Sequence, residues 1–158
     1  MHNVLFCGIG GQGVLKASEV CGVAAMLAGF HVKKSEVHGM AQRGGSVESH
    51  LRFGERVFSP LIPRGSADVL VCFDRAEGER LSPWLRPDGV SLVDYLESSA
   101  PADGRFLNTY LLGVLSAYLP IPRDLWLEAL VRVFSRAHEE NRAAFLQGAA
   151  QADRVRAA

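Results

Sequence analysis

The sequence is poor in cysteine. It contains three cysteines, Cys7, Cys21 and Cys72, and no two of them form a CxxC pair. A typical protein iron–sulfur cluster is held by four cysteine thiolates, so this set excludes a four-cysteine cluster within the chain. The histidines show no metal-ligand spacing either, and we expect no metal site. Cys7 and Cys72 lie in apolar strand-like runs and Cys21 in a helical pattern, so we expect buried, reduced thiols.

The sequence also lacks net charge, long apolar runs and a basic N-terminus. Lys plus Arg number 17 and Asp plus Glu number 17, which gives no support for binding to nucleic acid or to a membrane surface. The apolar runs are too short for a membrane span, and Met1-His2-Asn3 lacks the basic start of a signal peptide. We therefore expect a cytoplasmic protein. Its 158 residues, 48% of them hydrophobic, fit a single domain at 1–150, followed by a frayed polar tail at 151–158.

Apolar runs alternate with helical patterns along the chain. This order predicts an α/β fold: an open, Rossmann-like, mostly parallel sheet with flanking helices. The alternating run 47–53, the turn residues Gly54-Glu55 and the run 56–58 predict a β-hairpin inserted into that order. Pro87-Asp88-Gly89 predicts a turn, and Gly148 is expected to end the last helix. Strands are expected at 3–7, 31–37, 47–53, 68–73 and 90–93, and helices at 14–28, 74–85, 108–119, 122–134 and 139–147.

A glycine loop, GIGGQG at residues 8–13, joins the first strand to the first helix. Glycines let the backbone turn sharply, and a helix N-terminus offers free N–H groups to an anion. The spacing matches the GxGxxG of dinucleotide-binding proteins, and Glu36 ends the second strand where a ribose-binding acid would stand. Lys33, Lys34 and the short chain argue against that interpretation. The residues expected to bind an anion or ligand are Gly8, Gly10, Gly11, Gln12 and Gly13.

A second glycine-rich segment, SEVHGMAQRGGSV, occupies residues 35–47. Long glycine-rich loops between strands often carry binding residues, although a solvated loop with turn glycines is the alternative. His38 could titrate near neutral pH, and Arg43 could grip a phosphate or a carboxylate. No catalytic residue can be assigned. The residues expected to face a partner or a ligand are His38, Gln42, Arg43, Gly44 and Gly45.

Taken together, the two segments resemble the gamma-type small subunits of the 2-oxoacid:ferredoxin oxidoreductases. The glutamine of the glycine loop and the run HGMAQRGGSV are the specific parts, and they favour the indolepyruvate ferredoxin oxidoreductase beta subunit over the pyruvate type. The resemblance extends from about residue 4 to 148. It also includes 49–54, 59–62, 68–70, 108–113, Asn141, Phe145 and Gly148.

The resemblance implies a reaction in which a 2-oxoacid, here an aryl pyruvate, coenzyme A and oxidised ferredoxin give acyl-CoA, carbon dioxide and reduced ferredoxin. It further implies that thiamine diphosphate and iron–sulfur clusters belong to a large partner subunit, and that this chain binds no cofactor and is inactive alone. Ferredoxin would be met through the complex, and the isolated chain could form homo-oligomers. Two alternatives stay open: a stand-alone dinucleotide-binding module and a non-catalytic scaffold with this fold.

Overall fold

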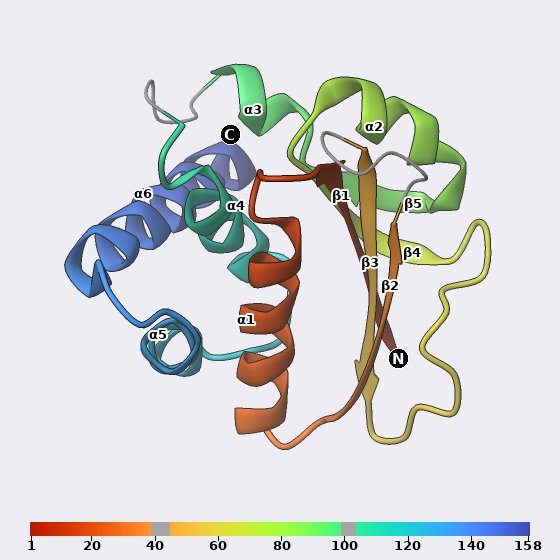
Figure 1. Ribbon diagram of the computed structural model, residues 1–158, viewed down its shortest axis with the longest axis horizontal. Helices are drawn as coiled ribbons and strands as arrows, with labels where there is room; N and C mark the ends of the chain where they lie inside the picture. The colour runs from red at the N-terminus through yellow and green to blue at the C-terminus, as the bar shows by residue number, and fades with distance from the viewer. Residues whose placement is uncertain (39–44, 99–103) are drawn as a thin grey trace.

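The computed structural model describes residues 1–38, 45–98 and 104–158, apart from the side chains of His38, Glu97 and Ser98. Its five-stranded sheet has the order β2-β3-β1-β4-β5 (Figure 1). β1 pairs in parallel with β4, and β4 with β5, whereas β3 is antiparallel to both β1 and β2. All strands except β3 therefore run in one direction, which confirms the mostly parallel α/β sheet. The strands are β1 (His2–Ile9), β2 (His31–His38), β3 (Ser46–Gly54), β4 (Ala67–Cys72) and β5 (Leu85–Ser91).

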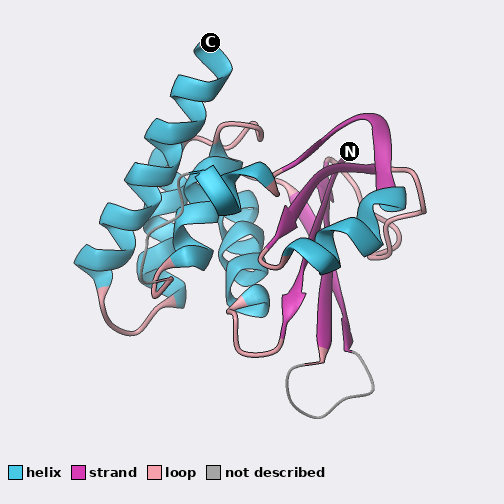
Figure 2. Cartoon of the chain, turned by 90° about the horizontal axis from the view of Figure 1, so that it is seen from above, coloured by secondary structure: helices cyan, strands magenta, loops and turns pink. Residues whose placement is uncertain are grey.

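Helices cover both faces of the sheet. On one side, the α1 face, α1 (Val14–Leu27) and α4 (Leu107–Ser116) pack on the strands, with α5 (Arg123–Val133) and α6 (His138–Ala157) outside them. On the other side, the α2 face, lie α2 (Arg75–Leu81) and the 3₁₀ helix η1 (Ser82–Trp84). Figure 2 shows that most of the helical mass gathers on one side of the strands.

The core follows from the sequence pattern. β1 is buried on both faces: Val4 and Phe6 belong to the larger apolar cluster on the α1 face, and Leu5 and Cys7 to the smaller cluster on the α2 face. This double burial explains why β1 is a continuous apolar run and not an alternating one. α1 ends just before a glycine: Gly29 has φ +93°, and the N–H of Phe30 donates to the carbonyl of Ala25 at 3.1 Å.

The predicted hairpin partner is wrong. The segment 56–58 is not a strand, and β3 pairs instead with β2 on one side and with β1 on the other. The hairpin of this fold is therefore the antiparallel pair β2–β3. The predicted turn at 87–89 lies inside β5, where the pairing with β4 is irregular. The short helix α3 (Asp94–Ser98) was not predicted.

The predicted end of the last helix is also wrong. α6 runs through Gly148 to Ala157, so residues 151–158, expected as a frayed tail, are largely its final turns. Gly148 is needed for another reason: a Cβ there would collide with the main-chain carbonyl of Tyr110 in α4. Gly113 of α4 faces the main chain of Phe145 in α6 in the same way. The two helices thus touch backbone to backbone.

Among the described residues, no helix is both long and apolar enough to cross a membrane.

Candidate functional site

The glycine loop is held by its own glutamine. The Oε1 atom of Gln12 accepts a hydrogen bond from the N–H of Ile9 at 2.7 Å, and its Nε2 atom donates to the carbonyl of Phe73 at 3.1 Å. The side chain therefore links the carboxyl ends of β1 and β4. Gly8 makes room for it, since a Cβ at Gly8 would lie 2.7 Å from Oε1 of Gln12. Gln12, expected as a ligand residue, has its side-chain amide engaged by the main chain of Ile9 and Phe73.

Two of the four glycines in the loop have left-handed backbone conformations. Gly11 has φ +93° and Gly13 has φ +83°, which disfavours a side chain at either position. A Cβ at Gly13 would also lie 2.6 Å from Nδ2 of Asn108 in α4. Gly13 occupies the N-cap position of α1, and no side chain caps this end of the helix. The turn at Gly13 therefore packs closely against α4.

A hollow of about 300 Å³ opens beside the loop. Its lining is the glycine loop, the first turn of α1 and one residue of β3: Ile9, Gly10, Gly11, Gly13, Val14, Leu15, Lys16 and Val47. Lys16 brings a cation to this place, although its Nζ atom lies 3.8 Å from Glu19. An uncapped helix N-terminus such as this one has main-chain N–H groups that favour a negatively charged group.

The second segment meets the glycine loop at this hollow. The N–H of Gly10 donates to the carbonyl of Gly45 at 3.0 Å, and Ile9 and Gly8 pair with Ser46 and Val47. His38 ends β2 opposite Val47. Gln42, Arg43 and Gly44 lie outside the described residues, as does the side chain of His38. The structure thus brings together the two segments that were singled out from the sequence, through their described ends.

Glu36 is displaced from the position of a ribose-binding acid. In a Rossmann unit the second strand neighbours the first, but here β3 lies between β1 and β2. Two strand spacings, about 10 Å, therefore separate β2 from the strand that carries the glycine loop. The Glu36 carboxylate lies 3.2 Å from Nζ of Lys34. This arrangement does not fit a dinucleotide that spans the two strand ends.

A chain of charges on the α2 face was not predicted. Nη2 of Arg80 lies 3.1 Å from Glu48 of β3, and Nε lies 2.8 Å from Glu77. Glu48 in turn lies 3.4 Å from Nε2 of His50, whose Nδ1 atom accepts the N–H of Ile62 at 3.1 Å. The carboxylates hold the pKa of Arg80 above its usual range. These ion pairs connect α2 to β3. No local sequence pattern indicates them, because 32 positions separate Glu48 from Arg80.

The cysteines are free and buried, as the sequence indicated. Cys7 and Cys72 stand opposite each other on β1 and β4. Burial raises the pKa of all three thiols above their usual range, to about 11 for Cys72. Thiols of this kind are poor nucleophiles and poor metal ligands. Within the described part of the chain, no group of three or more His, Cys, Asp or Glu could hold a metal ion.

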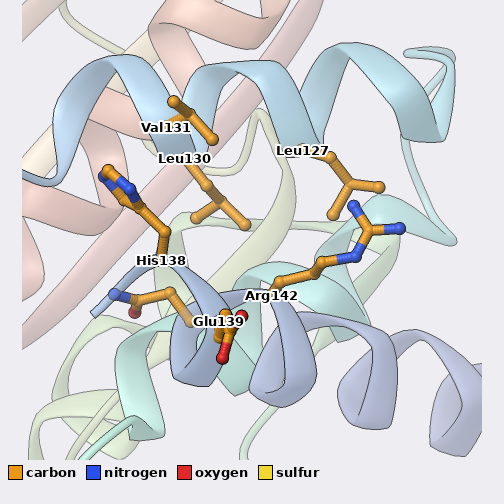
Figure 3. A pocket seen from close by; sticks show the side chains of 7 residues that line it. Leu127, Leu130, Val131, His138, Glu139 and Arg142 are labelled. Carbon is orange, nitrogen blue, oxygen red and sulfur yellow. The ribbon is translucent and has the colours of Figure 1, made fainter. Parts of the chain in front are cut away.

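A second small cavity, of about 140 Å³, lies between α5 and the first turn of α6. Leu127 and Leu130 of α5 point toward α6, whose His138, Glu139 and Arg142 form the other wall (Figure 3). His138 is engaged with the carbonyl of Phe134 at 2.8 Å. Asn141 is also partnered, because its Oδ1 atom accepts from Oγ1 of Thr109 at 2.7 Å. These polar groups serve the α4–α5–α6 junction.

The sequence is similar to one described family. The family model for pyruvate ferredoxin/flavodoxin oxidoreductase matches residues 3–103, a range that contains both glycine-rich segments.

Curated relatives of the chain, from four organisms, carry the name indolepyruvate oxidoreductase subunit IorB. The protein from Thermococcus kodakarensis is 44% identical over 89 residues, which cover 56% of this chain and 44% of the relative. The protein from Methanothermobacter thermautotrophicus is 48% identical over 93 residues, or 59% of this chain and 47% of the relative. The matched part therefore spans less than half of these relatives.

Two solved structures share the fold. The gamma subunit of the keto/oxoacid ferredoxin oxidoreductase from Geobacter sulfurreducens superposes with a TM-score of 0.77 at 24% identity, covering 96% of this chain and 98% of that chain. The 2-oxoglutarate:ferredoxin oxidoreductase from Magnetococcus marinus gives 0.72 at 20% identity, covering 96% of this chain and 31% of the longer chain.

Proposed function

Because the chain belongs to the pyruvate ferredoxin/flavodoxin oxidoreductase family, we propose that it is the accessory subunit of a thiamine-diphosphate-dependent 2-oxoacid:ferredoxin oxidoreductase. The carrying observation is the family match at 3–103, which takes in both glycine-rich segments. The enzyme would convert a 2-oxoacid and coenzyme A to acyl-CoA and carbon dioxide, and would pass the electrons to ferredoxin. The relatives named indolepyruvate oxidoreductase subunit, 43–48% identical, support an aryl pyruvate as substrate.

We assign the cofactors to a larger partner subunit. The residues of this chain do not fit an iron–sulfur cluster, because a four-thiolate cluster needs one cysteine more than the three in the sequence. Oxidative decarboxylation of a 2-oxoacid also needs a cofactor that stabilises a carbanion, the chemistry that thiamine diphosphate supplies. The contribution of this chain is then to bind and orient, through the glycine loop and the segment 35–47.

Within this proposal, the hollow beside the glycine loop faces the partner subunit or the coenzyme A phosphates. The N-terminus of α1 and the cation of Lys16 line it, and both favour a negatively charged group. His38, Gln42, Arg43, Gly44 and Gly45 are the proposed partner-facing or ligand-facing residues. The strand order that separates Glu36 from the glycine loop weighs against a stand-alone dinucleotide-binding module.

The test is reconstitution. We would co-express the chain with a thiamine-diphosphate subunit encoded beside its gene, purify through a tag on this chain, and measure CoA-dependent ferredoxin reduction. Co-purification and turnover of indolepyruvate in preference to pyruvate and 2-oxoglutarate are expected. Turnover by this chain alone with added thiamine diphosphate would contradict the division of labour. A co-purified complex that turns over no 2-oxoacid would favour the scaffold alternative.

One variant tests the loop within the complex. Arg43→Ala is expected to lower complex activity and to leave the melting temperature of the free subunit unchanged. Arg132→Ala is the control, because Arg132 pairs with Glu128 on the exposed side of α5, 2.7 Å away. Unfolding of the free subunit by Arg43→Ala would make this arginine structural.

A further inference from the structure

β2 forms one edge of the sheet. Among the described strands it pairs with β3 alone, so the outer side of its backbone meets no strand. Its side chains alternate between the faces. Lys34 and Glu36 stand opposite Leu51 and Ser49 on the α1 face, and Lys33 and Val37 stand opposite Arg52 and Glu48 on the α2 face. An edge of eight residues can template pairing with another strand.

Lysines usually protect such edges by opposing a second strand. Here both lysines are drawn back onto their own chain. Nζ of Lys33 donates to the carbonyl of Phe58 at 3.2 Å, and Nζ of Lys34 lies 3.2 Å from the Glu36 carboxylate. The α1 face of this edge therefore carries one positive and one negative charge, two positions apart, with Ser35 between them.

This charge pattern is complementary to itself when inverted. A second copy, turned about a twofold axis that is normal to the sheet and passes through Ser35, runs antiparallel to the first. Residues directly opposite in such a pair share a face. Lys34 then stands opposite Glu36 of the other copy, and Glu36 opposite Lys34. An axis one residue to either side would place Lys34 opposite Lys34, or Glu36 opposite Glu36, and like charges in these positions destabilise.

We propose that the β2 edge is a self-association surface on which a second copy of this chain adds its own β2, antiparallel and centred on Ser35. The charge pattern favours a second copy as the partner, because Lys34 and Glu36 of one β2 match Glu36 and Lys34 of an antiparallel β2. The two sheets then form one continuous sheet across the twofold axis.

The α2 face supports the same register. Val37 is 43% exposed and Phe58 is 80% exposed, although both are large and apolar. In the centred register Val37 stands opposite Lys33 of the second copy. The Lys33 amine binds the carbonyl of Phe58 in its own chain, so each Val37 faces the segment of the other copy that carries Phe58. Exposed apolar side chains thus cover one another on both sides of the axis.

The α1 face leaves room for the second copy. α1 packs on β1, β3 and β2 and so lies over β3. From β3 to β3 of the second copy there are three strand spacings, about 14 Å. Packed helices need 8–10 Å between axes, so the two α1 helices do not collide. The groove between α1 and β2, which Val23, Met26 and Lys34 help to line, borders the new strand pair.

The experiment measures the self-association constant of the full chain by sedimentation equilibrium. Lys34→Glu and Glu36→Lys each place like charges opposite one another at both cross-strand positions. We expect each to raise the dissociation constant roughly tenfold or more. The double variant, Lys34→Glu with Glu36→Lys, restores opposite charges in the reverse order, and its constant should return to within about threefold of the unaltered chain. Arg132→Glu, on the exposed side of α5, is the charge-matched control and should leave the constant unchanged.

Phe58→Ala provides a second test that does not depend on charge. Its exposed side chain can be removed with the fold intact, and weaker association by about three- to tenfold is expected from the lost apolar contact. A chain that stays monomeric at all concentrations overturns the proposal, as do single charge variants with an unchanged constant. A folded double variant that fails to recover association overturns the register. Because this chain alone is measured, the result is independent of the proposed enzymatic function.

Discussion

Gln12 of the glycine loop and Phe73, the residue after β4, are joined by a hydrogen bond of 3.1 Å from the side-chain amide to the main-chain carbonyl. The same amide accepts the N–H of Ile9 at 2.7 Å. One side chain therefore holds the ends of two parallel strands, whose central register pairs Phe6 with Val71. Gly8, which has no side chain, leaves room for the Gln12 side chain.

Replacement of Gln12 by Ala should lower the free energy of unfolding by about 1–3 kcal/mol, because a partly buried N–H and a carbonyl lose their partners. Gln12→Glu keeps the acceptor for Ile9 but turns a carboxylate toward the Phe73 carbonyl, so its deficit should shrink as the pH falls and the carboxyl gains a donor proton. Denaturant unfolding at pH 5 and pH 8 measures both. Gln147→Ala, at an exposed position of α6, is the control; equal effects at positions 12 and 147 would remove the structural role of Gln12.

The close packing of α4 on α6 predicts that alanine at Gly148 lowers the free energy of unfolding strongly. Gly148→Ala should destabilise by about 3 kcal/mol or more, because its Cβ meets the rigid main chain of Tyr110. Gly22→Ala in α1 is the matched control, since a Cβ there would lie 3.5 Å from Leu51, an ordinary contact. This change should stabilise by up to about 1 kcal/mol through helix propensity. Thermal unfolding of both variants measures the contrast, and a mild effect at Gly148 would mean that the helices can separate without loss.

Local patterns were enough to predict the first strand, the glycine loop and the first helix. The apolar run, the turn glycines and the C-terminal Gly29 are short-range signals, and each acts within a few residues. The alternation of β3 also predicted a strand correctly, although His50 is buried as well as its neighbours Ser49 and Leu51. It did not reveal the partners of β3. The segment nearest in sequence, 56–58, is not a strand, and β3 pairs with β1, up to 51 positions away, as in His2 with Phe53.

The remaining differences have the same origin. A glycine in a helical pattern can mark the end of the helix or a place where another backbone packs closely against it. Only the position of α4 shows that Gly148 marks close packing. The link from Glu48 to Arg80 joins β3 to α2, and the whole of β4 lies between them in the sequence. At the candidate site the sequence singled out Gln12, but its role depends on Phe73, 61 positions later. These contacts depend on residues far apart in the sequence, and neither composition nor periodicity predicts which residues those are.

The buried thiols predict a pH effect. The pKa of Cys72 rises from 9.0 to about 11 on folding, chiefly through burial. Between these values the folded chain keeps a proton that the unfolded chain has lost, so the contribution of this thiol to stability is full below pH 9 and is lost as the pH rises toward 11. Cys72→Ala should make the decline of the unfolding free energy shallower by at most about 1.4 kcal/mol per pH unit. Ser82→Ala should leave the slope unchanged. Identical slopes for Cys72→Ala and the unaltered chain would contradict the burial argument.

The hollow at the glycine loop predicts a preference for anions over dinucleotides. The N-terminus of α1 and Lys16 line it, whereas β3 separates Glu36 from the loop. Calorimetry on the free chain should detect weak, salt-sensitive binding of coenzyme A and phosphate, and no micromolar binding of NAD, NADP or FAD. Lys16→Gln should weaken coenzyme A binding a few-fold, because it removes one cation that is not part of the core. Arg132 is a comparable exposed cation on α5, and it pairs with Glu128 as Lys16 pairs with Glu19. Arg132→Gln should therefore leave coenzyme A binding unchanged. Micromolar binding of a nicotinamide dinucleotide would reverse the order of the hypotheses, and the chain would then be better described as a dinucleotide-binding module.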